Sequence, residues 1–177
     1  MANGVVADRC RAPDRCRAKE APPRYDEGMH PNVIDDPQAI GELLARTRRI
    51  AVLGIKTEAQ ADQPAFYVPK FVAESGFDVV PVPVYYPNVT TILGRPVFRR
   101  VADVPGPIDM VNVFRRSQDL APHLDDLLAA KPASVWLQQG IQDDTFAEQL
   151  AQQGILVVQD RCLMVELRLR AARRSQS

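Results

Sequence analysis

Short apolar runs alternate with amphipathic segments along most of the chain. The helical spacing of Ile40, Leu43 and Leu44 predicts a first helix over residues 37–48. Continuous apolar runs then predict five strands, over residues 50–53, 77–82, 108–114, 134–137 and 155–158. Helix-starting residues predict the remaining helices, from Pro64 to about 75, from Ser117 to about 131, from Asp143 or Asp144 to about 154, and from near Arg161 onward.

This order of elements predicts the fold class. Strands that are apolar on both faces and separated by helices are typical of a parallel sheet covered on both sides, with right-handed crossovers. The expected fold is therefore α/β, a three-layer, doubly wound, mostly parallel Rossmann-like sheet. The segment 83–94 is rich in Pro, Tyr and Asn and predicts a loop, followed by a brief strand at 96–98 and a helical turn at 101–104.

One domain with two tails is the expected organisation. The 177 residues, 46% of them hydrophobic, are enough for one core of ordinary density. We expect the domain to span residues 30–171, with a C-terminal tail over 172–177. Residues 1–29 contain a short duplication, at 8–12 and 14–18, with almost no apolar side chains, which predicts a disordered N-terminal tail.

Composition disfavours several classes of protein. Neither a signal peptide nor an apolar run of ~20 residues is present, so a cytoplasmic protein without a membrane span is expected. Residues 31–160 hold 11 Lys or Arg against 16 Asp or Glu, a net charge of −5, which disfavours nucleic-acid binding. Three cysteines and two histidines show no metal-ligand spacing, so no metal site is expected.

Ligands of such sheets bind at the carboxyl ends of the strands, here residues 54–57, 82–86, 114–116 and 137–141. Gly54 can bring backbone close to a phosphate, but the complete G-x-G-x-x-G fingerprint of dinucleotide sites is missing. No acid follows the second strand before Asp103, which disfavours NAD, and no Walker motif is present. An anionic nucleotide bound without hydrolysis remains.

Six segments carry a resemblance to a known family, at residues 50–54, 63–70, 92–97, 109–115, 135–141 and 160–166. In order and spacing they resemble the small stand-alone CoA-binding proteins of bacteria and archaea, over about residues 37–169. The resemblance implies the Rossmann-like CoA-binding domain that also occurs in the succinyl-CoA synthetase alpha subunit. It further implies coenzyme A or an acyl-CoA as the ligand of a non-catalytic binding or sensor module.

The resemblance also implies the site residues. Those near the phosphates would be Gly54, Ile55 and Lys56, and those on the adenosine side Val82, Pro83 and Tyr85. Phe114 and Arg115 would lie in the middle of the site, and Gln138, Gln139 and Gly140 beside the pantetheine arm. The chain departs from the family at Pro83-Val84-Tyr85, where Asn-Pro and a basic residue are common, and at Gln63, which replaces another basic residue.

Single residues have competing interpretations. Lys70 is either a further phosphate ligand or a solvated helix charge, and Arg116 is expected to point away from the ligand. Trp136 is expected in the core, whereas Cys162 is either a reactive thiol at a helix N-terminus or a small buried residue. His123 is expected on a helix far from the loops, so no catalytic residue is assigned.

Two other functions stay open at this point. One is an NAD(P)-dependent oxidoreductase with an atypical nucleotide loop, and the other is an accessory subunit whose site is vestigial. The sequence does not identify an acyl group, a protein partner or an oligomeric state.

Overall fold

Five parallel strands form one sheet in the computed structural model, which describes residues 29–175. They are β1 (Arg49–Leu53), β2 (Asp78–Val82), β5 (Met110–Val113), β6 (Ser134–Leu137) and β7 (Leu156–Val158). Their order across the sheet is β2-β1-β5-β6-β7, and every neighbouring pair is parallel. The predicted doubly wound α/β fold is confirmed, because the chain winds outward from β1 to β2 and then continues on the other side from β5.

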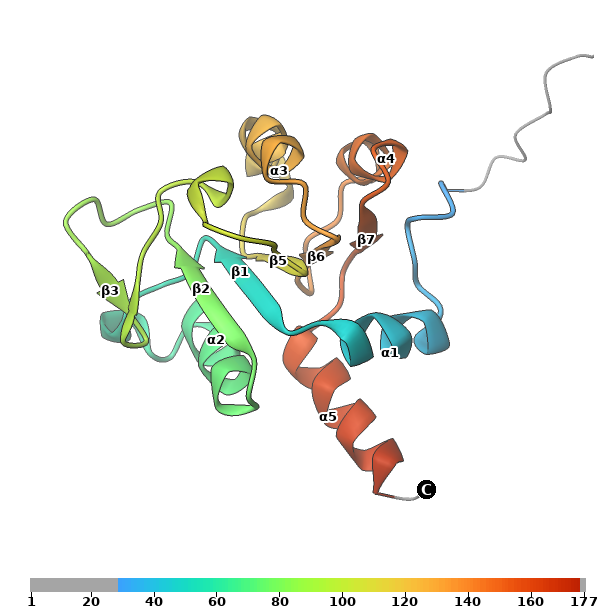
Figure 1. The fold of residues 1–177 in the computed structure, drawn as a ribbon, viewed down its shortest axis with the longest axis horizontal. Helices are drawn as coiled ribbons and strands as arrows, with labels where there is room; N and C mark the ends of the chain where they lie inside the picture. The colour runs from blue at the N-terminus through green and yellow to red at the C-terminus, as the bar shows by residue number, and fades with distance from the viewer. Residues whose placement is uncertain (1–28, 176–177) are drawn as a thin grey trace, which may run out of the picture.

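Helices cover both faces of the sheet (Figure 1). They are α1 (Pro37–Arg46), α2 (Pro64–Glu74), α3 (Leu124–Ala130), α4 (Asp144–Gln152) and α5 (Leu163–Arg174). The helices α3 and α4 lie on one face, and α1, α2 and α5 lie on the other. Alternate residues of each strand enter the two cores, so Val111 and Val113 belong to one and Met110 to the other. Three layers result, as the sequence predicts.

Helix starts follow the local signals in the sequence. The side chain of Asp36 accepts a hydrogen bond from the Ala39 amide at 2.8 Å and caps α1. Pro64 is the first residue of α2, where its missing N–H costs nothing. Of the two acids considered for α4, Asp143 is the cap, since its carboxylate accepts from the Phe146 amide at 3.0 Å.

The prediction of one continuous helix from Ser117 to Lys131 is wrong. Two 3-10 turns, at Ser117–Asp119 and Ala121–His123, precede the short helix α3. Pro122 explains the interruption, since it lacks an N–H and disfavours α-helical geometry at the residue before it. Ser117 does not cap a helix, and its hydroxyl instead accepts a hydrogen bond from the Gln142 amide at 3.2 Å.

The segment 83–94 is not entirely loop. A small antiparallel hairpin pairs β3 (Thr91–Ile92) with β4 (Arg95–Pro96), so the brief strand predicted at 96–98 lies earlier. Leu93 and Gly94 form its turn with φ of 52° and 69°, the left-handed geometry of a tight hairpin turn. The expected helical turn is present at Val101–Asp103.

The ends of the chain set the limits of the description. The predicted N-terminal tail, apart from Met29, lies outside the described residues and stays a prediction. At the other end, α5 continues to Arg174, past the expected domain end at residue 171. No helix within residues 29–175 combines the length and apolar character needed to cross a membrane.

The backbone at Leu53 and Gly54 joins the end of β1 to both of its neighbouring strands. Its amide donates to the Val82 carbonyl at 2.9 Å, and the carbonyl before it, that of Leu53, accepts from the Phe114 amide at 2.8 Å. Gly54 has φ of +88°, and a Cβ there would lie 2.6 Å from the Phe114 carbonyl oxygen. Both the backbone angle and the close approach therefore require glycine.

Replacing Gly54 by Ala should lower the free energy of unfolding by about 2–4 kcal/mol, because left-handed strain and overpacking act together. Gly76→Ala is the matched control, since Gly76 has φ of +92° but a Cβ there would meet nothing within 4 Å. The control should lose only about 1 kcal/mol, from strain alone. Urea unfolding followed by circular dichroism measures both, and equal losses would contradict the role given to the Phe114 contact.

Candidate functional site

The strand ends meet at one edge of the sheet because their last residues are paired in register. Leu53 is paired with Val82 on one side and with Val113 on the other, and Val113 is paired with Leu137. The loops that follow these strands therefore converge. Beside them lies a cavity of about 430 Å³. Its lining comprises Gln63, Pro64, Ala65, Tyr67 and Val68 of the α2 start, Phe114, Arg115, Arg116 and Ser117, Gln138, Gln139, Gly140 and Ile141, and Cys162.

The predicted site residues separate into two adjoining groups and a remainder. The cavity gathers Phe114, Arg115, Gln138, Gln139 and Gly140. A second group, formed by Gly54, Lys56 and Tyr85, lies against Arg115. The other three residues of these loops are buried and offer mainly their backbone to a ligand, and they are Ile55, Val82 and Pro83.

Arg115 connects the two groups. Its side chain is only 13% exposed, its Nη1 donates to the Tyr85 hydroxyl at 3.2 Å, and its Nη2 lies 3.6 Å from an Asp119 carboxylate oxygen. The buried Nε has no hydrogen-bond partner. Arg116 is 74% exposed and bonds Asp119 at 2.8 Å, but it also lines the cavity, so its orientation away from a ligand stays a prediction. Arg115 is therefore an enclosed cation with an unused donor.

Lys56 brings a second cation to the same place. Its Nζ lies 5.2 Å from the centre of the Tyr85 ring and 5.5 Å from that of Tyr86, while the Arg115 guanidinium lies 5.2 Å from the Tyr85 ring. These distances are typical of cation–π contacts. Within residues 29–175 no carboxylate pairs with Lys56. Two cations thus share one aromatic ring at the strand ends.

Arg99 holds the loop that carries the two tyrosines. Its guanidinium donates to the carbonyls of Tyr86 at 3.1 Å, Pro87 at 2.9 Å and Val89 at 2.6 Å. Tyr86 itself has φ of +67°, an uncommon angle for an aromatic residue. Sequence reasoning missed Arg99. The available signal was a proline-rich loop whose carbonyls need donors from elsewhere.

Lys70 is not brought to this site. It lies on α2 with its side chain more than half exposed, and its Nζ is 3.8 Å from Glu74 one turn later. This is the arrangement of a solvated helix charge. Lys70 does not line the cavity and has no contact with Lys56, Arg115 or the tyrosines.

A pair of buried amides lies behind the cavity. Gln138 donates from Nε2 to the Asn112 Oδ1 at 2.9 Å, and Asn112 is fully buried in β5. The Nδ2 of Asn112 has no partner. Asn112 was missed by sequence reasoning, although it is the one polar residue within Met110–Val113. The neighbouring Gly140 has φ of +81° and donates its amide to Asp160, which fixes this loop to the one after β7.

Cys162 lines the cavity at the residue before α5 and is partly exposed. Its neighbour Arg161 is engaged elsewhere, since it lies 3.3 Å from Glu166 and donates to the Asp35 carbonyl at 2.8 Å. Trp136 is fully buried and donates from Nε1 to the Arg161 carbonyl at 2.7 Å. The prediction that Trp136 is a core residue is confirmed.

A family model described as a CoA binding domain matches residues 48–168. The chain belongs to this CoA-binding domain family. The match lies within the segment of resemblance, and it includes both groups of site residues.

Individual relatives agree with this family membership. The uncharacterized protein YneT of Bacillus subtilis is 32% identical over 126 residues, which are 71% of this chain and 90% of that protein. The structure of cell-free ID.343 from Thermus thermophilus is 36% identical with a TM-score of 0.70, covering 77% of this chain and 99% of that one. A hypothetical protein from Pyrococcus horikoshii OT3 is 25% identical with a TM-score of 0.69, covering 82% and 99%.

The electrostatics of this CoA-binding domain centre on Arg115. Its hydrogen bond and its charge lower the pKa of the Tyr85 phenol. Burial, together with the charge of Arg115, lowers the pKa of His123. His123 lies at the end of the second 3-10 turn, just before α3, and does not line the cavity. The two 3-10 turns that replace a regular helix account for its position.

The Tyr85 phenol should ionise at a lower pH than an ordinary tyrosine, because Arg115 stabilises its charged form. In an ultraviolet titration the first phenolate of the wild type should appear at lower pH than in Tyr85→Phe. Removing the cation in Arg115→Ala should move that step upward, toward the value of the other tyrosines. If the phenol that Tyr85→Phe removes ionises in the wild type at the same pH as an ordinary tyrosine, the hydrogen bond between Arg115 and Tyr85 does not form in solution.

Proposed function

We propose that this chain binds coenzyme A or an acyl-CoA across the ends of β1, β2, β5 and β6, as a non-catalytic binding or sensor module. Membership of the CoA-binding domain family supports the ligand class. The arrangement of cations beside the cavity supports the position of the ligand. The strand-end position is also where ligands of doubly wound sheets bind.

The observation that carries the proposal is the state of Arg115. A guanidinium that is 13% exposed, with its Nε unpartnered, is suited to a charged acceptor. Lys56 adds a second cation, and the absent side chain of Gly54 allows the Phe114 carbonyl, and with it Arg115, to lie close to the loop that carries Lys56. The phosphates of coenzyme A would bind here. Local cations matter in this domain because residues 31–160 carry a net charge of −5.

The cavity suits the pantetheine arm, which joins methylene groups through amides. Its walls include the apolar Pro64, Val68, Phe114 and Ile141, which pack against methylenes. Gln139 and Gly140 offer polar groups at the rim, and Gln138 keeps an acceptor oxygen after donating to Asn112. We leave Lys70 out of the proposed site because it pairs with Glu74 outside it.

The lining chemistry favours binding over catalysis. Among the described residues that line the cavity there is no Asp, Glu or His to act as a general base. Cys162 is a nucleophile in this lining, and a base within hydrogen-bond reach would be needed to form a catalytic pair. A role in binding or sensing therefore fits the described residues better than a reaction.

A thermal-shift panel of coenzyme A, acetyl-CoA, NAD⁺ and NADP⁺ tests the ligand class. Coenzyme A at about 100 times its Kd should stabilise the fold by ~2.7 kcal/mol, which is a rise of roughly 5–10 °C in Tm. A shift with NAD⁺ or NADP⁺ alone would favour an oxidoreductase. No shift with any of the four would favour an accessory subunit with a vestigial site.

Arg115→Ala should weaken coenzyme A binding by about 1.5–3 kcal/mol, roughly ten- to a hundredfold in Kd, because a charged hydrogen bond to phosphate is lost. Arg116→Ala removes the same charge from an exposed neighbour and should bind nearly as wild type. Lys70→Ala is a second control for net charge. Calorimetric titration at low and moderate salt measures all four proteins, after circular dichroism confirms that each is folded.

Two results of the titration would contradict the assignment of Arg115. One is an Arg115→Ala variant that binds coenzyme A as tightly as the wild type. The other is an Arg116→Ala variant that is the weaker of the pair.

A further inference from the structure

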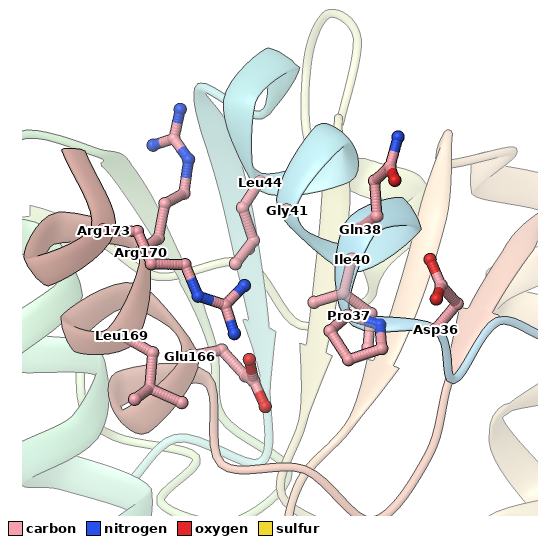
Figure 2. A pocket seen from close by; sticks show the side chains of 10 residues that line it. All are labelled: Asp36, Pro37, Gln38, Ile40, Gly41, Leu44, Glu166, Leu169, Arg170 and Arg173. Carbon is pink, nitrogen blue, oxygen red and sulfur yellow. The ribbon is translucent and has the colours of Figure 1, made fainter. Parts of the chain in front are cut away.

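A second concave surface lies between α1 and α5 (Figure 2). These two helices share one face of the sheet with α2 (Figure 1). The volume of this concave surface is about 710 Å³, and none of its lining residues belongs to the cavity at the strand ends. The lining consists of Asp36, Pro37, Gln38, Ile40, Gly41 and Leu44 from the α1 side, and Glu166, Leu169, Arg170 and Arg173 from α5. We call it the α1/α5 groove.

An exposed apolar strip runs along α5 beside the α1/α5 groove. Val165 is 44% exposed and Leu169 is 46% exposed, and they lie one helical turn apart with the exposed Ala172 nearby. On the opposite side, Ile40 and Leu44 are each only 1% exposed, so the exposed apolar area comes from α5. Single exposed leucines are ordinary, but two large apolar residues in line beside an apolar groove are typical of a contact surface.

Gly41 leaves the backbone of α1 uncovered at the α1/α5 groove. It lies inside α1, where glycine lowers helix stability relative to alanine, and a Cβ there would meet nothing within 4 Å. The described chain therefore offers no packing reason for glycine at this position. A side chain from another molecule would supply one, because the missing Cβ lets it reach the helix backbone.

Charges along the α1/α5 groove are unequally distributed. Asp36 at the start of α1 and Glu166 in the first turn of α5 are acidic, whereas Arg170 and Arg173 follow in later turns of α5. Figure 2 shows the Arg170 guanidinium projecting from α5 into the space between the helices. Within the part of the chain that the structure describes, Arg170 has no hydrogen-bond or ion-pair partner.

A two-fold axis would make this surface complementary to itself. In such an interface, if residue i of one copy contacts residue j of the other, then residue j of the first copy also contacts residue i of the second, so Asp36 of each copy can face Arg170 of the other. The same operation would bring the α5 strip of one molecule over the open backbone at Gly41 in the second. The Asp36–Arg170 charges and the exposed apolar area of α5 thus point to one occupant, a second copy of the chain.

We propose that two copies of this chain form a dimer through the α1/α5 groove, with Leu169 of each packed over the partner's Gly41 and Arg170 facing the partner's Asp36. The α1/α5 groove shares no lining residue with the cavity proposed for coenzyme A.

Sedimentation equilibrium of the full chain from ~1 to ~200 µM, a range that brackets a micromolar Kd, measures the dimer. The wild type should be dimeric at the upper end. Leu169→Glu and Gly41→Leu should be monomeric throughout, the first because it charges the strip and the second because it fills the groove. Leucine is a better helix former than glycine, so Gly41→Leu remains folded. Met29→Glu alters an equally exposed apolar residue outside the groove and should stay dimeric.

Two charge-reversal variants test the contact between Arg170 and the partner's Asp36 separately. Arg170→Glu should raise the dimer Kd at least tenfold, whereas Arg46→Glu, in the last turn of α1 and outside the groove, should leave it unchanged. A wild type that stays monomeric at ~200 µM, or a dimer insensitive to Leu169→Glu and Gly41→Leu, overturns the proposal. The proposal is also overturned if the full chain stays monomeric and only a variant lacking residues 1–28 dimerises. In that case the N-terminal segment of the chain itself, and not a second copy, would be the occupant of the groove.

Discussion

The close approach of the first and third parallel strands at Gly54 organises the ligand edge of this protein. A Cβ at that position would lie 2.6 Å from the Phe114 carbonyl oxygen, so the two loops can be this near only where a side chain is absent. Lys56 follows Gly54 by two residues and Arg115 follows Phe114 directly. A single backbone contact therefore brings two cations to the switch point of the sheet, where the winding direction reverses.

The aromatic loop after β2 completes this arrangement. Tyr85 accepts a hydrogen bond from Arg115 and has both cations within 5.2 Å of its ring centre. Arg99 keeps the loop in place through three backbone carbonyls. Two like charges are thus held close together by a neutral ring and by fixed dipoles, with Asp119 as the acidic partner of Arg115. Such a preorganised pair is suited to an anion with more than one phosphate charge.

Local patterns predicted the strands, a helix start at Asp143 or Asp144, and the strand-end positions of Gly54 and Arg115, because each depends on neighbours in sequence. Pro122 was itself a local signal for an interrupted helix, but the prediction of one helix from Ser117 to Lys131 did not take it into account. Arg99 and Asn112 could not be assigned, since their roles depend on tertiary contacts with residues 86–89 and with Gln138. The α1/α5 groove was likewise absent from the sequence pattern, because it depends on how two helices diverge over the sheet.

Amide hydrogen exchange with and without saturating coenzyme A tests the position of the ligand most directly, since it reports protection along the backbone in one measurement. The account predicts slower exchange in the loops 54–57, 83–86, 114–117 and 138–141. The exchange rates of the amides in α1 and α5 should not change. Protection confined to the α1/α5 groove, or no protection in any of the four loops, would contradict it.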